Sequence, residues 1–161
     1  MSGLKKVKIF LSLDIQTKLI LLEAFVFLGW ARLLKSIPFS KIAPSFGEQM
    51  EETSFYVKES HKKGLGQVSR AIEIMSRNTI WESMCLVKAI AAMKMLERRG
   101  IESTLYLGTA KDKAGKMIAH AWLRSGPFFI TGAEEKDDFV VVGKFARNIS
   151  HPHAGGDENG E

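Results

Sequence analysis

The spacing of apolar residues changes once along the chain, close to Gly100. Before this point, apolar side chains recur every three or four positions, which is the spacing of one face of a helix. After it, they recur at every second position, which is the spacing of a half-buried strand. Helices that precede a run of short strands are typical of α+β folds. The pattern therefore predicts an α+β protein.

The helical spacing occupies three stretches. Residues 9–36 form the first, with a break near Asp14, and residues 65–75 form the second. The third covers residues 83–99 and is apolar on almost every side, which predicts a helix at the centre of its domain. Residues 48–63 are polar and suit either a surface loop or a weak helix.

The alternating spacing predicts three strands and a candidate fourth. A charged loop that contains a glycine joins the first two strands, and a tight turn at residues 125–127 joins the next two. The strands are expected at residues 101–107, 117–124, 128–132 and 139–142.

The composition is that of an ordinary globular protein. A chain of 161 residues is long enough for one domain with a substantial core and too short for a second large domain. Its net charge of +5 is spread along the sequence, which favours a solvated surface over a nucleic-acid interface. One cysteine forms no internal disulfide, so a reducing cytoplasm is the expected compartment. We expect an N-terminal helical segment (residues 1–47), a core (48–149) and a disordered tail (150–161).

The most apolar stretch covers residues 19–34. Glu23 and Arg32 interrupt it, and its uninterrupted part is far shorter than the roughly 20 residues that a membrane-spanning helix needs. We therefore expect no membrane span. Two interpretations of this helix stay open: it is buried in the domain, or it docks on a partner protein or a membrane surface.

Cys85 is the candidate residue with the clearest chemistry. It lies at the start of the third helix, and His120 follows on the second predicted strand. A thiol attacks a carbonyl as its thiolate, and the positive end of a helix dipole favours that anion. If Ser83 is the N-cap, Cys85 lies in the first helical turn, where unpaired N–H groups can also bind the oxyanion of a tetrahedral intermediate. A neighbouring imidazole takes the thiol proton and then gives it to the leaving amine.

Each of these residues also has a purely structural interpretation. Most free cysteines are small buried hydrophobes, and a histidine on a strand is often a core residue with satisfied hydrogen bonds. Trp81 and Trp122 flank the candidate site, where they either shape a peptide groove or serve only packing.

The tail carries a loose resemblance to a metal site. His151, His153 and Asp157 lie close together there, with no further ligand at a convincing spacing. We therefore expect no metal, and nothing in the sequence indicates a cofactor.

Several segments together carry a family resemblance. The cysteine and histidine segments are specific in combination at this separation, whereas either segment alone is a weak signal. The segments are residues 23–34 with Pro38-Phe39; Trp81, Cys85 and Leu86 with Ala89 and Ala91; Leu96, Arg99, Gly100 and Ile101; Leu105 and Gly108; and Ala119-His120-Ala121-Trp122. Through them, residues 21–145 resemble the stand-alone leader peptidases of lasso-peptide biosynthesis. This is a bacterial transglutaminase-like family related to the C-terminal domain of microcin-processing proteins.

The resemblance implies a papain-like fold in its transglutaminase variant, with a nucleophile helix packed on a small antiparallel sheet. It implies a cysteine protease that removes the leader from a ribosomally made precursor, with Cys85 as nucleophile and His120 as general base and then acid. It also implies three partners, namely the precursor leader peptide, a leader-recognition protein and the lasso cyclase. Because the N-terminal region lacks a hairpin-rich pattern, we expect the recognition protein to be a separate chain. The alternative is a non-catalytic peptide-binding or scaffold protein on the same fold.

The sequence departs from the family at the third member of the triad. The family places an aspartate on the strand after the histidine, where it holds the imidazole tautomer. With a turn at residues 125–127, antiparallel pairing sets His120 opposite Thr131, a residue without charge. A register shift can instead bring one of the following acids into reach, unless these acids form a solvated loop. They are Glu134, Glu135, Asp137 and Asp138. The third member stays open, as does the choice between hydrolysis and amide transfer.

Overall fold

A computed structural model describes residues 3–79 and 84–149 of the chain. The helices dominate its N-terminal half, as the sequence predicts. They are α1 (Gly3–Ser12), α2 (Ile15–Leu34), α3 (Phe39–Ile42), α4 (Glu59–Ser76) and α5 (Cys85–Glu97), with 3-10 turns η1 (Ala43–Phe46) and η2 (Lys136–Asp138).

Asp14 causes the predicted break in the first helical stretch. Its carboxylate accepts hydrogen bonds from the Thr17 backbone N–H at 2.9 Å and from the Thr17 hydroxyl at 2.6 Å, so Asp14 is the N-cap of α2. These two hydrogen bonds lower the pKa of Asp14. The carboxylate is therefore held in its charged form at the positive end of the α2 dipole.

The strands form one antiparallel five-stranded sheet in the order β1-β5-β2-β3-β4. Their bounds are β1 (Glu48–Gln49), β2 (Ser103–Lys111), β3 (Met117–Ser125), β4 (Phe128–Thr131) and β5 (Val140–Arg147). The candidate fourth strand of the sequence is β5, and it pairs with β2 rather than continuing the meander beyond β4. The polar residues 48–63 are not one loop or one weak helix, because they contain β1 and the first turn of α4.

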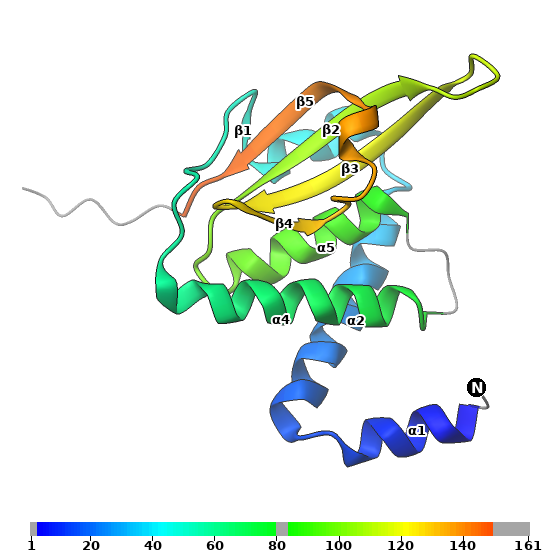
Figure 1. Ribbon diagram of the computed structural model, residues 1–161, viewed down its shortest axis with the longest axis vertical. Helices are drawn as coiled ribbons and strands as arrows, with labels where there is room; N and C mark the ends of the chain where they lie inside the picture. The colour runs from blue at the N-terminus through cyan, green and yellow to red at the C-terminus, as the bar shows by residue number, and fades with distance from the viewer. Residues whose placement is uncertain (1–2, 80–83, 150–161) are drawn as a thin grey trace, which may run out of the picture.

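α2, α4 and α5 lie in a layer under one face of the sheet, and α1 projects away from that layer (Figure 1). α5 contacts β2, β3 and β4 on one side and α2 and α4 on the other. The core between these elements contains apolar side chains from both layers. Among its fully buried residues are Leu28, Val68, Ile72, Ile90, Met93, Met95, Leu96, Leu105 and Leu123. The architecture is thus the predicted α+β arrangement, with α5 at its centre.

α2 buries only one of its faces. Leu21, Ala24, Leu28 and Ala31 are buried at helical spacing, whereas Leu19, Leu22, Val26 and Leu33 are exposed on the remaining surface. The buried interpretation of this apolar stretch therefore holds for one face, and the other face stays available. Across the described residues, no helix is long and apolar enough to cross a membrane.

Candidate active site

Cys85 is the first residue of α5 and is partly buried against the core. Met84 is the N-cap, and its carbonyl accepts the first helical hydrogen bond from the Lys88 N–H at 3.0 Å. The N–H groups of the three residues before Lys88 therefore have no acceptor within the helix, and the Met84 side chain does not cap them. The expected cap, Ser83, lies outside the described residues.

A positive charge lies at the same end of α5. The Lys35 ammonium contacts the sulfur of Met84, the residue that directly precedes the cysteine. Together with the helix dipole and the N–H groups that lack an acceptor within the helix, this charge favours a negatively charged group here, such as the oxyanion of a reaction intermediate.

His120 lies on β3, and one hydrogen bond fixes its tautomer. Its Nε2 lies 3.0 Å from the carbonyl oxygen of Gly132. A carbonyl oxygen only accepts, so the proton of the neutral imidazole must be on Nε2. Nδ1 then carries the free lone pair, which is the atom that a general base needs.

Aromatic rings and a glycine hold the imidazole in place. The ring centroid of His120 lies 5.8 Å from that of Trp122, nearly parallel to it, and 5.1 Å from that of Phe139. Gly108 pairs with His120 across β2 and β3. A Cβ at Gly108 would lie 2.8 Å from the Trp122 ring and 2.9 Å from the Cβ of Phe139. The packing of these rings around His120 therefore requires glycine at position 108. Trp122 is 4% exposed and stacks on Tyr106, which supports its packing role.

The predicted position of Thr131 opposite His120 is wrong. The turn between β3 and β4 is shorter than expected, since Ser125 pairs directly with Phe128, and a register shift follows between Leu123 and Arg124. Thr131 therefore pairs with Leu123 and projects to the face opposite that of His120. Its buried hydroxyl has no hydrogen-bond partner among the residues that the structure describes.

Among the described residues, no acidic side chain takes the place of the family's triad aspartate beside His120. Glu134, Glu135, Asp137 and Asp138 are exposed, which agrees with a solvated charged loop, and Asp137 pairs with the adjacent Lys136. The imidazole is instead oriented by the Gly132 carbonyl. The sequence offers only one hint of this role, a glycine directly after a strand, and Gly132 does adopt a φ of +71°.

The structure brings the elements that carry the two candidate residues together. α5 contacts β3, and both run in the same direction across the view, so their first residues lie at the same end of the sheet (Figure 1). Ala121 and Leu123 of β3 belong to the core shared with α5, whereas His120 projects to the opposite face with Trp122. Within residues 3–79 and 84–149, no hydrogen bond joins the Cys85 thiol to the imidazole.

A buried arginine shares the sheet face of His120, and the sequence pattern gave no sign of it. Arg124 is 2% exposed and donates hydrogen bonds to the Tyr106 hydroxyl at 2.9 Å, to Gly126 O at 2.7 Å and to Thr53 O at 2.9 Å. The Tyr106 hydroxyl in turn donates to Glu52 at 2.6 Å. Burial, and then the hydrogen bond to Glu52, raise the pKa of Tyr106, so this hydroxyl keeps its proton. The network fastens residues 52–54 to the sheet.

Two of the residues that carry the family resemblance contact each other. Glu23 of α2 forms a two-point ion pair with the Arg99 guanidinium, at 3.0 Å and 2.7 Å, and a further pair with Arg98 at 3.2 Å. These contacts fasten α2 to the end of α5. Glu23 and Arg99 therefore act in the packing of the helices, away from the candidate nucleophile at the other end of α5.

The remaining candidates lie outside the described residues. They are Trp81, which belongs to the resemblance, and His151, His153 and Asp157 of the loose metal motif. Over the residues that the structure does describe, no group of three or more metal-ligating side chains occurs.

Comparison with known proteins identifies a family for most of the chain. A family model described as the transglutaminase-like superfamily matches residues 24–144. No curated protein and no solved structure matched the chain. The matched region contains α5 with Cys85 and β3 with His120, and it covers well over half of the sequence. The chain therefore belongs to the transglutaminase-like superfamily.

Proposed function

We propose that the chain is a cysteine peptidase with Cys85 as nucleophile and His120 as general base and acid. The observation that carries the proposal is a thiol on the first residue of α5, at the end of the sheet where β3 begins, together with an imidazole on β3 that has its lone pair on Nδ1. Transglutaminase-like proteins include cysteine peptidases and transglutaminases, so the family agrees with this chemistry.

The proposed reaction is an acyl transfer. Nδ1 of His120 takes the thiol proton, and the Cys85 sulfur attacks the carbonyl carbon of the scissile peptide bond. The unpaired N–H groups at the start of α5 hydrogen-bond the oxyanion. The imidazolium gives its proton to the leaving amine as the C–N bond breaks, which leaves a thioester. Water attacks the thioester and gives a proton to Nδ1; the C–S bond then breaks, Nδ1 returns the proton to the departing sulfur, and the acid and the free thiol are released.

The Gly132 carbonyl supplies part of what a triad acid supplies. It holds the neutral imidazole in the productive tautomer, but it offers no negative charge to the imidazolium. The thiol and Nδ1 must also come into contact during the reaction. Because His120 projects to the sheet face opposite the core shared with α5, this contact requires a rearrangement at this end of the sheet. We therefore propose an enzyme with a cysteine–histidine dyad and a modest rate.

The proposed substrate is the leader portion of a lasso-peptide precursor. This finer assignment rests on the segments of the sequence that resemble stand-alone leader peptidases, Cys85 and His120 among them. The leader-recognition protein is proposed as a separate partner, so cleavage by this chain alone is expected to be slow. A fused domain would supply a high effective concentration of leader, and a separate partner does not.

One observation favours a second candidate, a non-catalytic scaffold. Among the described residues no carboxylate contacts His120, and the imidazole lies on the sheet face opposite the core that includes α5. Thiol reactivity separates the two candidates. A catalytic Cys85 reacts with iodoacetamide at pH 6–7, well below about 8.5, where an ordinary thiol ionises. A thiol that stays unlabelled up to that pH favours the scaffold.

The deciding experiment is mass spectrometry of a cognate precursor incubated with the protein and its recognition partner. Wild type is compared with Cys85→Ala, with His120→Ala and with Lys113→Ala, a control on the exposed loop between β2 and β3. A discrete leader fragment from wild type and control alone supports the peptidase. Full leader removal by Cys85→Ala would overturn it, and an intact precursor that still binds wild type would support the scaffold.

A further inference from the structure

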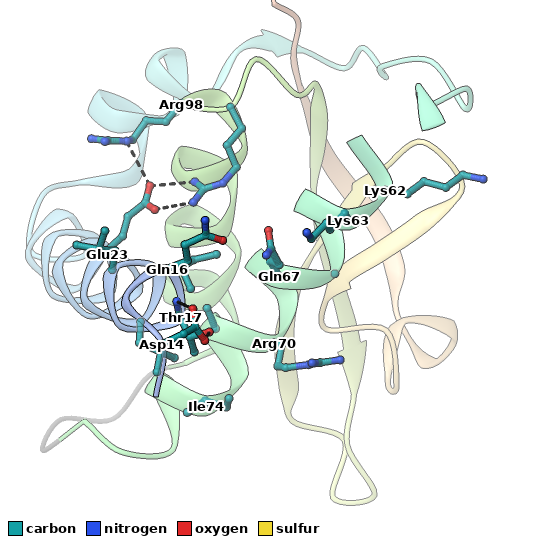
Figure 2. A pocket seen from close by; sticks show the side chains of 16 residues that line it. Asp14, Gln16, Thr17, Glu23, Lys62, Lys63, Gln67, Arg70, Ile74 and Arg98 are labelled. Atoms are coloured by element: carbon teal, nitrogen blue, oxygen red, sulfur yellow. Dashed lines mark hydrogen bonds and ion pairs between the residues drawn. The ribbon is translucent and has the colours of Figure 1, made fainter. Parts of the chain in front are cut away.

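A hollow of the described surface lies between α2 and α4, away from both candidate catalytic residues. Figure 2 shows it from close by, and its cavity volume is about 1000 Å³. Its apolar lining comes from both helices. Ile20, Leu21 and Ala71 are largely buried, whereas Leu19 and Ile74 are 58% and 41% exposed. Leu19 and Ile74 thus leave apolar surface exposed inside a concave site, where apolar side chains of a partner can cover it.

Basic side chains line one wall and one end of this groove. Lys62, Lys63 and Arg70 of α4 line one wall, and Arg98 and Arg99 lie at one end of it. In Figure 2, Lys63 and Gln67 lie on the side of α4 that faces α2, and Lys62 and Arg70 extend along its outer side.

Carboxylates neutralise only part of this charge. Glu23 is shared between Arg98 and Arg99, and Glu59 pairs with Lys62, whereas Asp14 is engaged as the N-cap of α2. Among the described residues, neither Lys63 nor Arg70 has a carboxylate partner. The groove therefore carries a net positive charge beside an apolar floor, and an acidic occupant complements it.

α1 extends the same character beyond one end of the groove. Its Lys6 ammonium donates to Asn78 at 2.9 Å, just after α4 ends, which ties α1 to that side. Leu4, Val7 and Leu11 recur at helical spacing along α1 and are all more than half exposed. An apolar and basic surface therefore continues from the groove onto α1.

We propose that the groove between α2 and α4 binds an acidic amphipathic helix of a partner protein. Its apolar stripe would lie against Leu19 and Ile74, and its carboxylates would pair with Lys63 inside the groove and with Arg70 at the outer edge of α4. A groove walled by two helices accepts the side-chain ridges of a third helix. A bilayer surface is too flat to enter this hollow, which is why the occupant is a polypeptide. The proposal does not depend on the chemistry of Cys85.

The test is fluorescence anisotropy with two labelled synthetic helices. One carries Glu and Leu in amphipathic spacing, and the other carries Lys in place of every Glu. Each is titrated with wild type, with Lys63→Glu/Arg70→Glu, and with Lys113→Glu/Lys116→Glu as a matched charge reversal on the β2–β3 loop. Circular dichroism melting of all three proteins checks that they fold alike.

The wild-type protein should bind the acidic helix, and the groove reversal should weaken that binding by about tenfold or more while it gains affinity for the basic helix. The loop reversal should change either affinity by less than about twofold. Leu19→Asp should also weaken binding of the acidic helix, and Cys85→Ala should not.

Three results would overturn the proposal: no binding of the acidic helix at millimolar protein, equal affinity for both helices, or indifference to the groove reversal. Cosedimentation with phosphatidylserine vesicles in place of peptide binding would also overturn it and would assign the basic α1 to a membrane surface. A failed cleavage assay with intact peptide binding would count against the proposed peptidase alone.

Discussion

Arg124 and His120 lie on the same face of the same strand, yet their surroundings differ. Arg124 is almost fully buried, and several hydrogen bonds to backbone and side-chain acceptors occupy its guanidinium. His120 is partly exposed, is held by the Gly132 carbonyl, and keeps one ring nitrogen without a hydrogen bond among the described residues. β3 thus presents two polar groups on one face: the Arg124 guanidinium, whose hydrogen bonds are all made within the fold, and the His120 imidazole, which is oriented but keeps one nitrogen available.

This difference separates structural from chemical roles by a physical criterion. A buried polar group that is fully satisfied costs much to remove and has no capacity left for a substrate. A group fixed in one tautomer with a free lone pair can exchange a proton. Four predictions sharpen the comparison or break it.

The largest expected effect is on catalysis at His120. His120→Asn should lower kcat/KM for leader cleavage by about 10²–10⁴-fold, the usual contribution of a general base. The melting temperature should change little, because the side chain makes a single hydrogen bond. Cleavage kinetics and thermal melting measure the two quantities. A variant that cleaves normally but unfolds easily would make His120 a second structural residue, and the contrast with Arg124 would disappear.

The next effect is on stability at Arg124. Arg124→Met leaves the carbonyl oxygens of Thr53 and Gly126 without their donors in a buried site, and it should lower the free energy of unfolding by about 2–4 kcal/mol. Denaturant unfolding measures the change. Arg77→Met is the matched control, since Arg77 is exposed and makes only a surface pair with Glu73, and it should cost less than about 0.5 kcal/mol. Equal costs for both variants would argue against the buried network.

Gly132→Ala tests how the imidazole is held. An added Cβ would lie 2.6 Å from Ala121 O and 3.1 Å from His120 Nε2, at a φ of +71° that disfavours alanine. We expect a loss of about 1–3 kcal/mol of stability and a fall in kcat that exceeds any rise in KM.

Gly115→Ala provides the control for that substitution. It has a similar φ of +78° and no atom within 4 Å of the added Cβ, so it carries the backbone strain without the clash. It should cost about 1–2 kcal/mol of stability and leave kcat unchanged. If both glycine variants reduce kcat equally, the Gly132 carbonyl has no special role in orienting the imidazole.

The smallest effect concerns Glu97, which lies outside this sheet face and serves as a reference. Burial opposes its charged form, but hydrogen bonds from Arg147 and Lys94 outweigh burial and lower the pKa of Glu97. A carboxyl with a lowered folded-state pKa stabilises the protein above its unfolded value, near 4.5, and loses this effect as the pH falls through the folded value. Wild type should therefore lose up to about 1 kcal/mol more than Glu97→Gln between pH 6 and pH 3. If the free energies of unfolding of wild type and Glu97→Gln depend on pH in the same way, the prediction is wrong.

Part of the fold could be predicted because its signals are local. The helical spacing located α2, α4 and α5, and Asp14 was recognised as the break between α1 and α2. The period of two located β2, β3 and β4 to within a few residues. Cys85 was placed in the first turn of its helix, and it is the first residue of α5. Periodicity and capping depend on residues a few positions apart, so one sequence contains them.

The register of the β3–β4 hairpin could not be predicted, and it changed the candidate site. Counting residues across the turn placed Thr131 beside His120, but a register shift between Leu123 and Arg124 moved it to the other face. A single extra residue in one strand inverts the side chains that follow it, and the sequence carries no local sign of it. The carbonyl of Gly132 was missed for the same reason, since backbone atoms have no signature in the sequence.

The sequence by itself determined the kinds of elements in this protein, their order, and the thiol and imidazole that the proposed chemistry uses. The tertiary structure alone decided which face of the sheet each side chain occupies, that a backbone carbonyl orients His120, that Arg124 is buried, and that α2 and α4 leave a basic groove between them. The physical reason is the separation along the chain of the residues that interact. Element type follows from neighbours along the chain, whereas faces, networks and grooves arise from contacts between residues that only folding brings together.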